Sequence, residues 1–183
     1  LEDLPFMGHS FHQLDELTIL HQISTNAVEV GDVVELLQRS ANIIGQRLFS
    51  DDLSIWLFDE KKQVLEDLAH FSPGDVIHLP TDHIPLNVGI IGTVAARKQA
   101  MRVMDVSKEP LYRAYYPWVK SELCVPMHIG EQLIGVINAE SKALDAFQEA
   151  DERLLATIAG LLAMAVERLR SEAELEQRVH DRT

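Results

Sequence analysis

Four polar side chains in two neighbouring apolar segments have the spacing of a chemical site. Glu122 and Cys124 are two residues apart, and so are Asn138 and Glu140. In an extended strand such residues point to the same face, so each pair presents its polar groups together. Burying them costs free energy unless they find partners. A ligand, water or donors from a loop would meet that need, and so would a satisfied structural network.

Covalent catalysis needs a nucleophile beside a base, and the sequence shows no such pairing. Cys124 is the only cysteine, which excludes an internal disulfide and a multi-cysteine zinc site. It lies within a predicted strand, where a small packing residue is expected. His70, His78 and His83 have no ligand spacing typical of a metal site. These features predict a protein that is not an enzyme, and they name no cofactor or metal.

Charge and composition exclude several classes of partner. The net charge of −13 disfavours nucleic acid and anionic membrane surfaces, because both bind clustered Lys and Arg. A hydrophobic content of 46% predicts a folded core. No apolar run reaches the ~20 residues of a membrane span, and the first residues lack the pattern of a signal peptide. We therefore expect a cytoplasmic segment, and the absence of an initiator Met suggests a piece of a longer protein.

Helical periodicity marks both ends of the chain. It predicts a first helix at about Ser10–Ala27, a second from behind Asp32 to about Leu48, and a last from near Gln148 to about His180. Asp32 stands three residues before a Glu, the spacing of a capping box.

Short apolar runs between these helices predict strands. The runs are Leu53–Phe58, Val64–Phe71, Val76–Leu79, Met101–Met104, Leu123–Ile129 and Leu133–Ala139. A short helix at Thr93–Arg97 and a helical turn near Tyr112–Tyr116 are also predicted. Gly135 within a strand indicates close approach of another backbone or side chain. The order predicts an α+β fold with terminal helices on one face of a single sheet.

Several motifs match a known family in order and spacing. They are Ile84-Pro85-Leu86 with Gly89-Ile90-Ile91-Gly92, Val103-Met104-Asp105-Val106, Ser121-Glu122-Leu123-Cys124-Val125-Pro126-Met127, Leu133-Ile134-Gly135-Val136-Ile137-Asn138 and Phe147-x-x-x-Asp151-Glu152. Together they resemble the GAF domain, over roughly Leu17–Leu169. The resemblance implies a PAS-related antiparallel sheet with the N- and C-terminal helices on one face. Loops and short helices would cover a pocket on the other face.

Three functional subclasses of that family differ from this chain. GAF domains that bind cyclic nucleotides carry Asn-Lys, whereas Ala139 follows Asn138 here. Bilin-binding members share Ile84-Pro85 in the pocket loop, but this chain has no cysteine at their attachment positions. Free methionine sulfoxide reductases use several cysteines, so the lone Cys124 without a resolving partner argues against that chemistry.

The resemblance places a ligand between the sheet and the central loops. The predicted ligand-binding residues are His83, Ile84, Trp118, Glu122, Cys124, Asn138 and Glu140. Tyr112, Tyr115 and Tyr116 accompany Trp118 in the expected lid. These aromatic residues would close over an apolar or planar ligand, or form a small core beneath a long loop.

The family resemblance also implies a role in signalling. Residues 1–9 would be a tail, 10–169 the GAF domain, and 170–183 the start of a coiled-coil linker. Leu162, Val166, Leu169 and Ala173 follow near-heptad spacing, which predicts a homodimer through the terminal helices. The expected downstream module is a kinase or cyclase, as in a bacterial histidine kinase of a two-component system.

The expected function is a non-enzymatic sensory domain that binds an unknown small molecule. Ligand binding would shift the packing of the helices and relay that change to the downstream module. A degenerate GAF domain that only dimerises is one alternative. A GAF-fold enzyme acting on a small molecule is the other.

Overall fold

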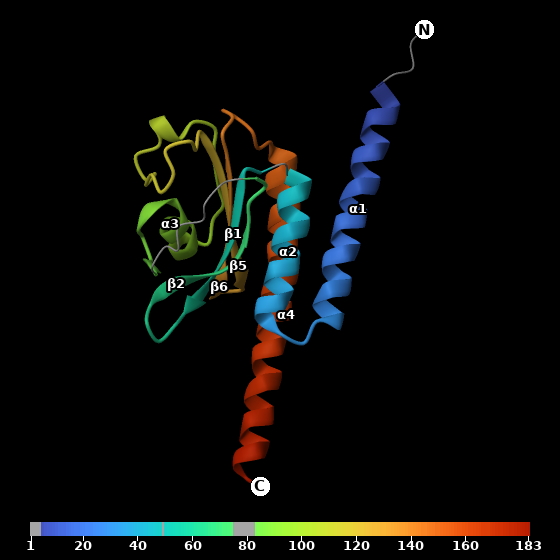
Figure 1. The fold of residues 1–183 in the computed structure, drawn as a ribbon, viewed down its shortest axis with the longest axis vertical. Coiled ribbons are helices and arrows are strands. Elements are labelled where there is room, and N and C mark those ends of the chain that lie inside the picture. The colour runs from blue at the N-terminus through green and yellow to red at the C-terminus, as the bar shows by residue number, and fades with distance from the viewer. Residues whose placement is uncertain (1–4, 49, 75–82) are drawn as a thin grey trace.

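One antiparallel sheet separates two unlike layers in this computed structural model. The structure describes residues 5–48, 50–74 and 83–183, with side chains from Asp15 onward. Long helices cover one face of the sheet, and a short helix with loops covers the other (Figure 1). This arrangement confirms the predicted α+β fold.

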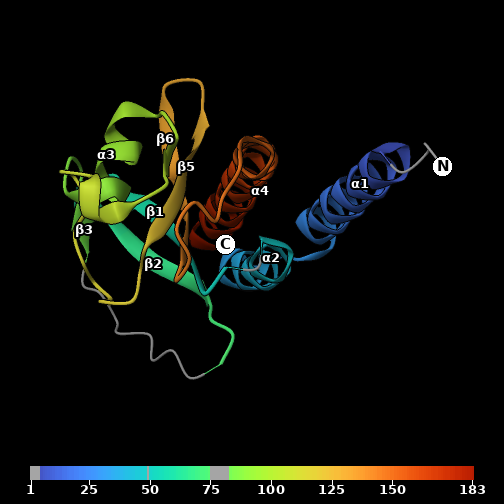
Figure 2. The same cartoon turned by 90° about the horizontal axis from the view of Figure 1, so that it is seen from above.

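The helical layer consists of α1 (Pro5–Glu29), α2 (Val33–Leu48) and α4 (Glu149–Asp181). Helices α2 and α4 lie against the sheet, whereas α1 packs outside them and its N-terminal half points away (Figure 2). Side-chain hydrogen bonds cap the N-termini of α2 and α4. The Asp32 carboxylate accepts a hydrogen bond from the Glu35 amide at 2.8 Å, and the Asp151 carboxylate accepts one from the Gln148 amide at 2.8 Å.

The sheet has the strand order β3-β2-β1-β6-β5-β4. The strands are β1 (Asp52–Asp59), β2 (Val64–Phe71), β3 (Ile84–Pro85), β4 (Met101–Val103), β5 (Ser121–Ile129) and β6 (Gln132–Ser141). Strands β1 and β6 lie at the centre and are buried on both faces along most of their length. The other face is covered by α3 (Gly89–Arg97), a 3-10 turn at Val106–Lys108 and the lid loop, residues 109–118.

Alternation along β5 and β6 separates two hydrophobic clusters. Leu123, Val125 and Ile137 point into the cluster beneath α2 and α4. Cys124 and Val136 belong instead to the cluster beneath α3 and the lid loop. Because side chains alternate between faces, a polar residue that shares the face of Cys124 and Val136 points away from α2 and α4 and toward α3 and the lid loop.

Gly135 is the point of closest approach between the two central strands. A Cβ atom there would lie 2.0 Å from the carbonyl oxygen of Trp56, which is backbone and cannot rotate away. The close approach predicted for Gly135 is therefore present, and the approaching atom belongs to the backbone of β1.

Two local predictions differ from the structure. The helical turn expected near Tyr112–Tyr116 is absent, and the turn lies earlier, at Val106–Lys108, where the Asp105 carboxylate caps the Ser107 amide at 3.0 Å. Helix α1 starts at Pro5, inside the segment expected to be a tail. The predicted strand at Val76–Leu79 lies outside the described residues. The division between domain and linker at residue 169 stays a prediction, and α4 continues through it as one helix.

The two glycines Gly135 and Gly160 give a matched test of this packing. We expect Gly135→Ala to destabilise the protein by at least ~2 kcal/mol, because overpacking against backbone forces the strands apart. Gly160→Ala, in α4 with no atom within 4 Å of its Cβ position, should stabilise by ~0.5–1 kcal/mol through helix propensity. Urea denaturation measures both. Equal stability of the two variants would contradict the register of β1 and β6.

Candidate functional site

Three carboxyl groups form a row across strands β1, β6 and β5, near one end of these strands and on the face beneath the lid. Glu122 of β5 is the register partner of Glu140 of β6, and Glu140 is the partner of Asp52 of β1. Side chains directly opposite each other on adjacent strands lie within contact range. All three residues are buried, at 3–5% relative exposure.

A second polar row runs beside the first. Cys124 is the partner of Asn138, and Asn138 is the partner of Ser54. The Ser54 hydroxyl accepts a hydrogen bond from the Trp56 indole at 2.8 Å. The two rows therefore place a thiol, an amide and three carboxyls on one small area of the sheet.

Burial keeps the glutamate pair protonated. Loss of solvent raises the pKa of Glu122 to about 8, and a hydrogen bond from Asn138 only partly opposes this. The pKa of Glu140 is also raised, first by burial and then by the charges of Glu122 and Asp52. At neutral pH the pair therefore holds at least one proton that it could donate.

Two polar atoms beneath the lid have no partner among the described residues. They are the side-chain oxygen of Asn138, whose residue is 2% exposed, and the hydroxyl of Tyr112. A buried polar atom without a hydrogen bond is costly. Both atoms are therefore available to a water or a ligand that enters this site.

The Cys124 thiol is fully buried in the same area. Burial raises its pKa, and the neighbouring Glu122 and Glu140 raise it further. The resting cysteine is consequently a thiol. A thiolate would form only when a bound molecule brings compensating charge or accepts the proton.

The lid closes the site almost completely. A cavity of about 10 Å³ remains between α3, the lid loop and β5, with Glu122, Tyr112 and Tyr115 in its wall. That volume holds about one water molecule. Any larger ligand requires the lid loop to move.

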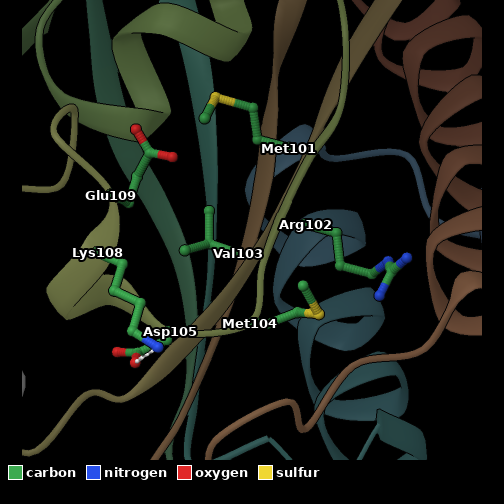
Figure 3. Close-up of a pocket in the computed structure, with 7 residues that line it drawn as sticks. All are labelled: Met101, Arg102, Val103, Met104, Asp105, Lys108 and Glu109. Carbon is green, nitrogen blue, oxygen red and sulfur yellow. Dashed lines mark ion pairs between the residues drawn. The ribbon is translucent and has the colours of Figure 1, made fainter.

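A larger and more open hollow near the sheet lies elsewhere. It has a volume of about 420 Å³ and follows the edge strand β4 (Figure 3). Met101 and Val103 face it from one side of the strand, while Arg102 turns to the other side and forms ion pairs with Glu149 and Glu152 of α4. This hollow contains none of the paired polar groups, whereas the smaller closed cavity has Glu122 in its wall.

Four of the predicted ligand-binding residues come together, namely Glu122, Cys124, Asn138 and Glu140. His83 lies near the opposite edge of the sheet, where its side chain is 53% exposed and its Nδ1 atom is 3.7 Å from the Glu66 carboxylate. Ile84 is a core residue beside α3. Trp118 stacks on Tyr116 at 5.4 Å between ring centroids. A ligand-binding role for each of the seven residues stays a prediction.

The sequence pattern does not single out Asp52, and His70 is considered near the expected pocket only as a possible haem or metal ligand. Asp52 stands at the start of a strand, where its register with Glu140 cannot be read from spacing. Pairing of His70 with Ser54 across β1 and β2 is what brings it to the same face.

Residues 31–167 match the family model described as GAF domain. The chain belongs to the GAF domain family. Two curated relatives are GAF domain-containing protein A of Dictyostelium discoideum, 35% identical over 74 residues, and the free methionine-R-sulfoxide reductase of Escherichia coli (strain K12), 33% identical over 70 residues. These matches cover 40% and 38% of the chain, and 47% and 42% of the relatives. The chain thus spans about half the length of the curated relatives it matches.

Solved structures show the same fold over most of the GAF chain. The free methionine-R-sulfoxide reductase from Neisseria meningitidis, in complex with its substrate, superposes with a TM-score of 0.78 at 25% identity, covering 86% of this chain and 91% of that one. The GAF domain of the Acinetobacter phosphoenolpyruvate-protein phosphotransferase has a TM-score of 0.75 at 22% identity, covering 85% and 94%. At that identity the second likeness concerns the fold alone.

These relatives correct two expectations. The chain was expected to be a non-enzymatic sensory domain, and the lone cysteine was read as evidence against an enzyme. Free methionine-R-sulfoxide reductases stand among both the curated relatives and the similar structures, so the enzymatic alternative is favoured. The family match leaves the attached kinase or cyclase and the bacterial origin as predictions.

Membrane and metal sites were searched along the same residues. None of the helices in the described part of the chain combines the length and apolar character needed to cross a bilayer. Residues 5–48, 50–74 and 83–183 also contain no cluster of three or more His, Cys, Asp or Glu side chains that would hold a metal ion.

The raised pKa of Glu122 predicts a pH-dependent stability. An acid whose pKa rises on folding stabilises the fold below its unfolded pKa, and this contribution is lost as the pH rises through the folded pKa. For Glu122 the window runs from about 4.5 to about 8. We expect the free energy of unfolding to fall across this window, by at most ~1.4 kcal/mol per pH unit for one proton.

Glu122→Gln should flatten that dependence, because glutamine mimics the neutral carboxyl. Glu131→Gln, at a fully exposed turn position, is the matched control and should leave the slope unchanged. Urea denaturation at several pH values measures the slope. A slope that is the same in Glu122→Gln and the unsubstituted protein would show that Glu122 is ionised in the fold.

Proposed function

We propose that this GAF chain is an enzyme that reduces a small sulfoxide, with free methionine-R-sulfoxide as the candidate substrate. Two lines support the proposal. Relatives and similar structures include reductases of that name. The site also combines a thiol with protonated carboxyls on one face of the sheet, and this combination is the observation that carries the proposal.

Cys124 is the proposed nucleophile. Its sulfur bonds to the sulfoxide sulfur while the sulfoxide oxygen takes up one proton from the acid, which the thiol proton replaces. The protonated oxygen then moves to the Cys124 sulfur as the sulfur–sulfur bond and the original sulfur–oxygen bond break. Transfer of the oxygen leaves a sulfenic acid on Cys124 and releases the sulfide. The thiol is oxidised by two electrons and the sulfoxide is reduced by two, so the step balances.

Glu122 is the proposed general acid. It lies two residues from Cys124 on the same face and holds a proton at neutral pH. General acid catalysis of this kind contributes ~10²–10⁴-fold. Asn138, whose amide hydrogen bonds to both glutamates, would keep their carboxyl groups oriented.

Regeneration of Cys124 requires thiols from outside the chain, because the sequence contains no second cysteine. One external thiol condenses with the sulfenic acid to give a mixed disulfide and water. A second thiol then attacks that disulfide and releases the Cys124 thiol. A lone cysteine therefore supports the full cycle when a small thiol or a dithiol protein is the reductant.

Substrate entry would require the lid loop to open, since the closed cavity holds about one water. Tyr112 and Tyr115 in the cavity wall would then cover the bound molecule. Closure would exclude water from the sulfenic acid, which reacts with other nucleophiles.

The decisive test is the release of free methionine from its R-sulfoxide, with dithiothreitol as reductant and the S-sulfoxide as the stereochemical control. We expect turnover to depend wholly on Cys124, so Cys124→Ala should abolish it. Glu122→Gln should lower kcat by at least ~10²-fold, and Glu131→Gln should not. Absence of methionine release by the unsubstituted protein, or full activity in Cys124→Ala, would refute the proposal.

Homodimerisation through the terminal helices is a second proposal, and it is the role that a catalytically inactive GAF domain would keep. The last part of α4 extends beyond the sheet (Figure 1). Leu175 and Val179, four residues apart on this extension, are 59% and 65% exposed and line an apolar hollow. A second copy of α4 presents the same stripe, which makes it a suitable partner.

Leu175→Glu should shift the assembly toward monomer, because it places a charge in the shared apolar stripe. Gln177→Glu adds the same charge to an exposed polar position of the same helix and should not shift it. Sedimentation equilibrium measures the difference. A monomeric unsubstituted protein would contradict the dimer, whereas a dimer without sulfoxide reduction would favour a purely scaffolding role.

A further inference from the structure

Asp52, His70 and Ser72 form a polar group of three side chains at the β2 end of the carboxyl row. The His70 Nε2 atom lies 3.1 Å from the Asp52 carboxylate oxygen and 3.0 Å from the Ser72 hydroxyl oxygen. The Ser72 hydroxyl donates to the same Asp52 oxygen at 2.8 Å. Asp52 thus accepts a hydrogen bond from Ser72 and lies within ion-pair distance of His70, an arrangement that favours its ionised form.

Asp52 connects this group to the glutamate pair. Its register partner on β6 is Glu140, which in turn faces Glu122 on β5. The three acids therefore follow one another across three adjacent strands, from the closed cavity to the side chain of His70, which is 20% exposed. The sequence separates Asp52 from Glu140 widely, and the sheet alone brings them together.

Helix α2 and strands β1 and β6 contribute described neighbours of His70. Helix α2 packs against it with Gln38, whose side-chain amide donates to the His70 carbonyl oxygen at 2.7 Å and whose side-chain oxygen accepts from the His70 amide at 3.2 Å. Strand β1 presents Asp52 and Ser54, and β6 presents Glu140 behind Asp52. His70 lies within ion-pair distance of Asp52 at one end of the row, and Arg113 and Tyr112 line the cavity wall beside Glu122 at the other end.

The geometry points to Asp52 and His70 as positioning residues that control the proton held by the Glu122–Glu140 pair. An ionised Asp52 repels a second negative charge at Glu140 and so keeps the pair protonated. A protonated His70 partly offsets this repulsion, because its positive charge stabilises the ionised form of the acids in the row. Neither residue touches the cavity, so they act through the glutamates.

This inference rests on the proposed function in one respect, that the pair is the proton donor of the reaction. Loss of the Asp52 charge would then leave less protonated acid at neutral pH. The alkaline limb of the activity profile should move to lower pH, while binding of substrate changes little. A purely structural role would lower activity at all pH values alike.

The test that does not depend on activity is infrared titration of the protonated carboxyl band, with glutamate labelled by carbon-13 to separate it from aspartate. We expect a protonated glutamate signal that persists above pH 6 in the unsubstituted protein. Asp52→Asn keeps the acceptor oxygen but removes the charge, and should lower the titration midpoint of the pair by about one pH unit. His70→Gln keeps a donor but removes a side chain that can carry positive charge, and should raise the titration midpoint of the pair.

The opposite signs of the two changes make the test specific. His128→Gln, at an exposed histidine of β5, is the control for His70→Gln, and Glu131→Gln is the control for loss of a carboxyl. Circular dichroism confirms folding, and His70→Gln decides alone if Asp52→Asn does not fold. Unchanged titration in both variants would overturn the inference. Failure to reduce a sulfoxide would refute the proposed function and leave this titration unaffected.

Discussion

The fixed antiparallel register of β5, β6 and β1 is the constraint on which the rest of this structure depends. A slip of one residue would exchange the two faces of a strand. Glu122 would then point into the apolar layer beneath α2 and α4, and Leu123 would point toward the lid. Close contact between Gly135 and the Trp56 carbonyl helps to hold the register, because only glycine fits there. The alternation of polar and apolar side chains on β5 and β6 thus becomes a separation of core and site.

Burial of three acids side by side is costly, and the protein lowers that cost by protonation. An isolated ionised carboxylate in a dry interior is strongly disfavoured, so the pair retains protons that it would lose in water. The hydrogen bond from Ser72 and the nearby His70 allow Asp52 to be the ionised member. Burial therefore costs stability and, by raising the pKa values of Glu122 and Glu140, also leaves a proton donor at neutral pH.

The single cysteine shows why the sequence argument against an enzyme is insufficient. The chain does have a single cysteine, and it does lack an internal disulfide partner. Reduction of a sulfoxide nevertheless requires only one thiol for the oxygen transfer, and the later thiols need not belong to the chain. The reductase relatives favour the enzymatic alternative, and the position of Cys124 and Glu122 on one face of β5 is consistent with the chemistry proposed for it.

Local sequence determined the elements and their faces. Period-two alternation predicted that Glu122 joins Cys124 and that Asn138 joins Glu140, and helical periodicity predicted the long terminal helices. These properties depend on neighbours in the chain, so the sequence alone suffices for them. The family resemblance then supplied their assembly into one sheet. Which residues meet across strands was decided only by tertiary structure: Asp52 and His70 join the site because β1 lies between β6 and β2. Closure of the cavity likewise depends on how the lid loop packs on β5, a long-range contact that no local pattern encodes.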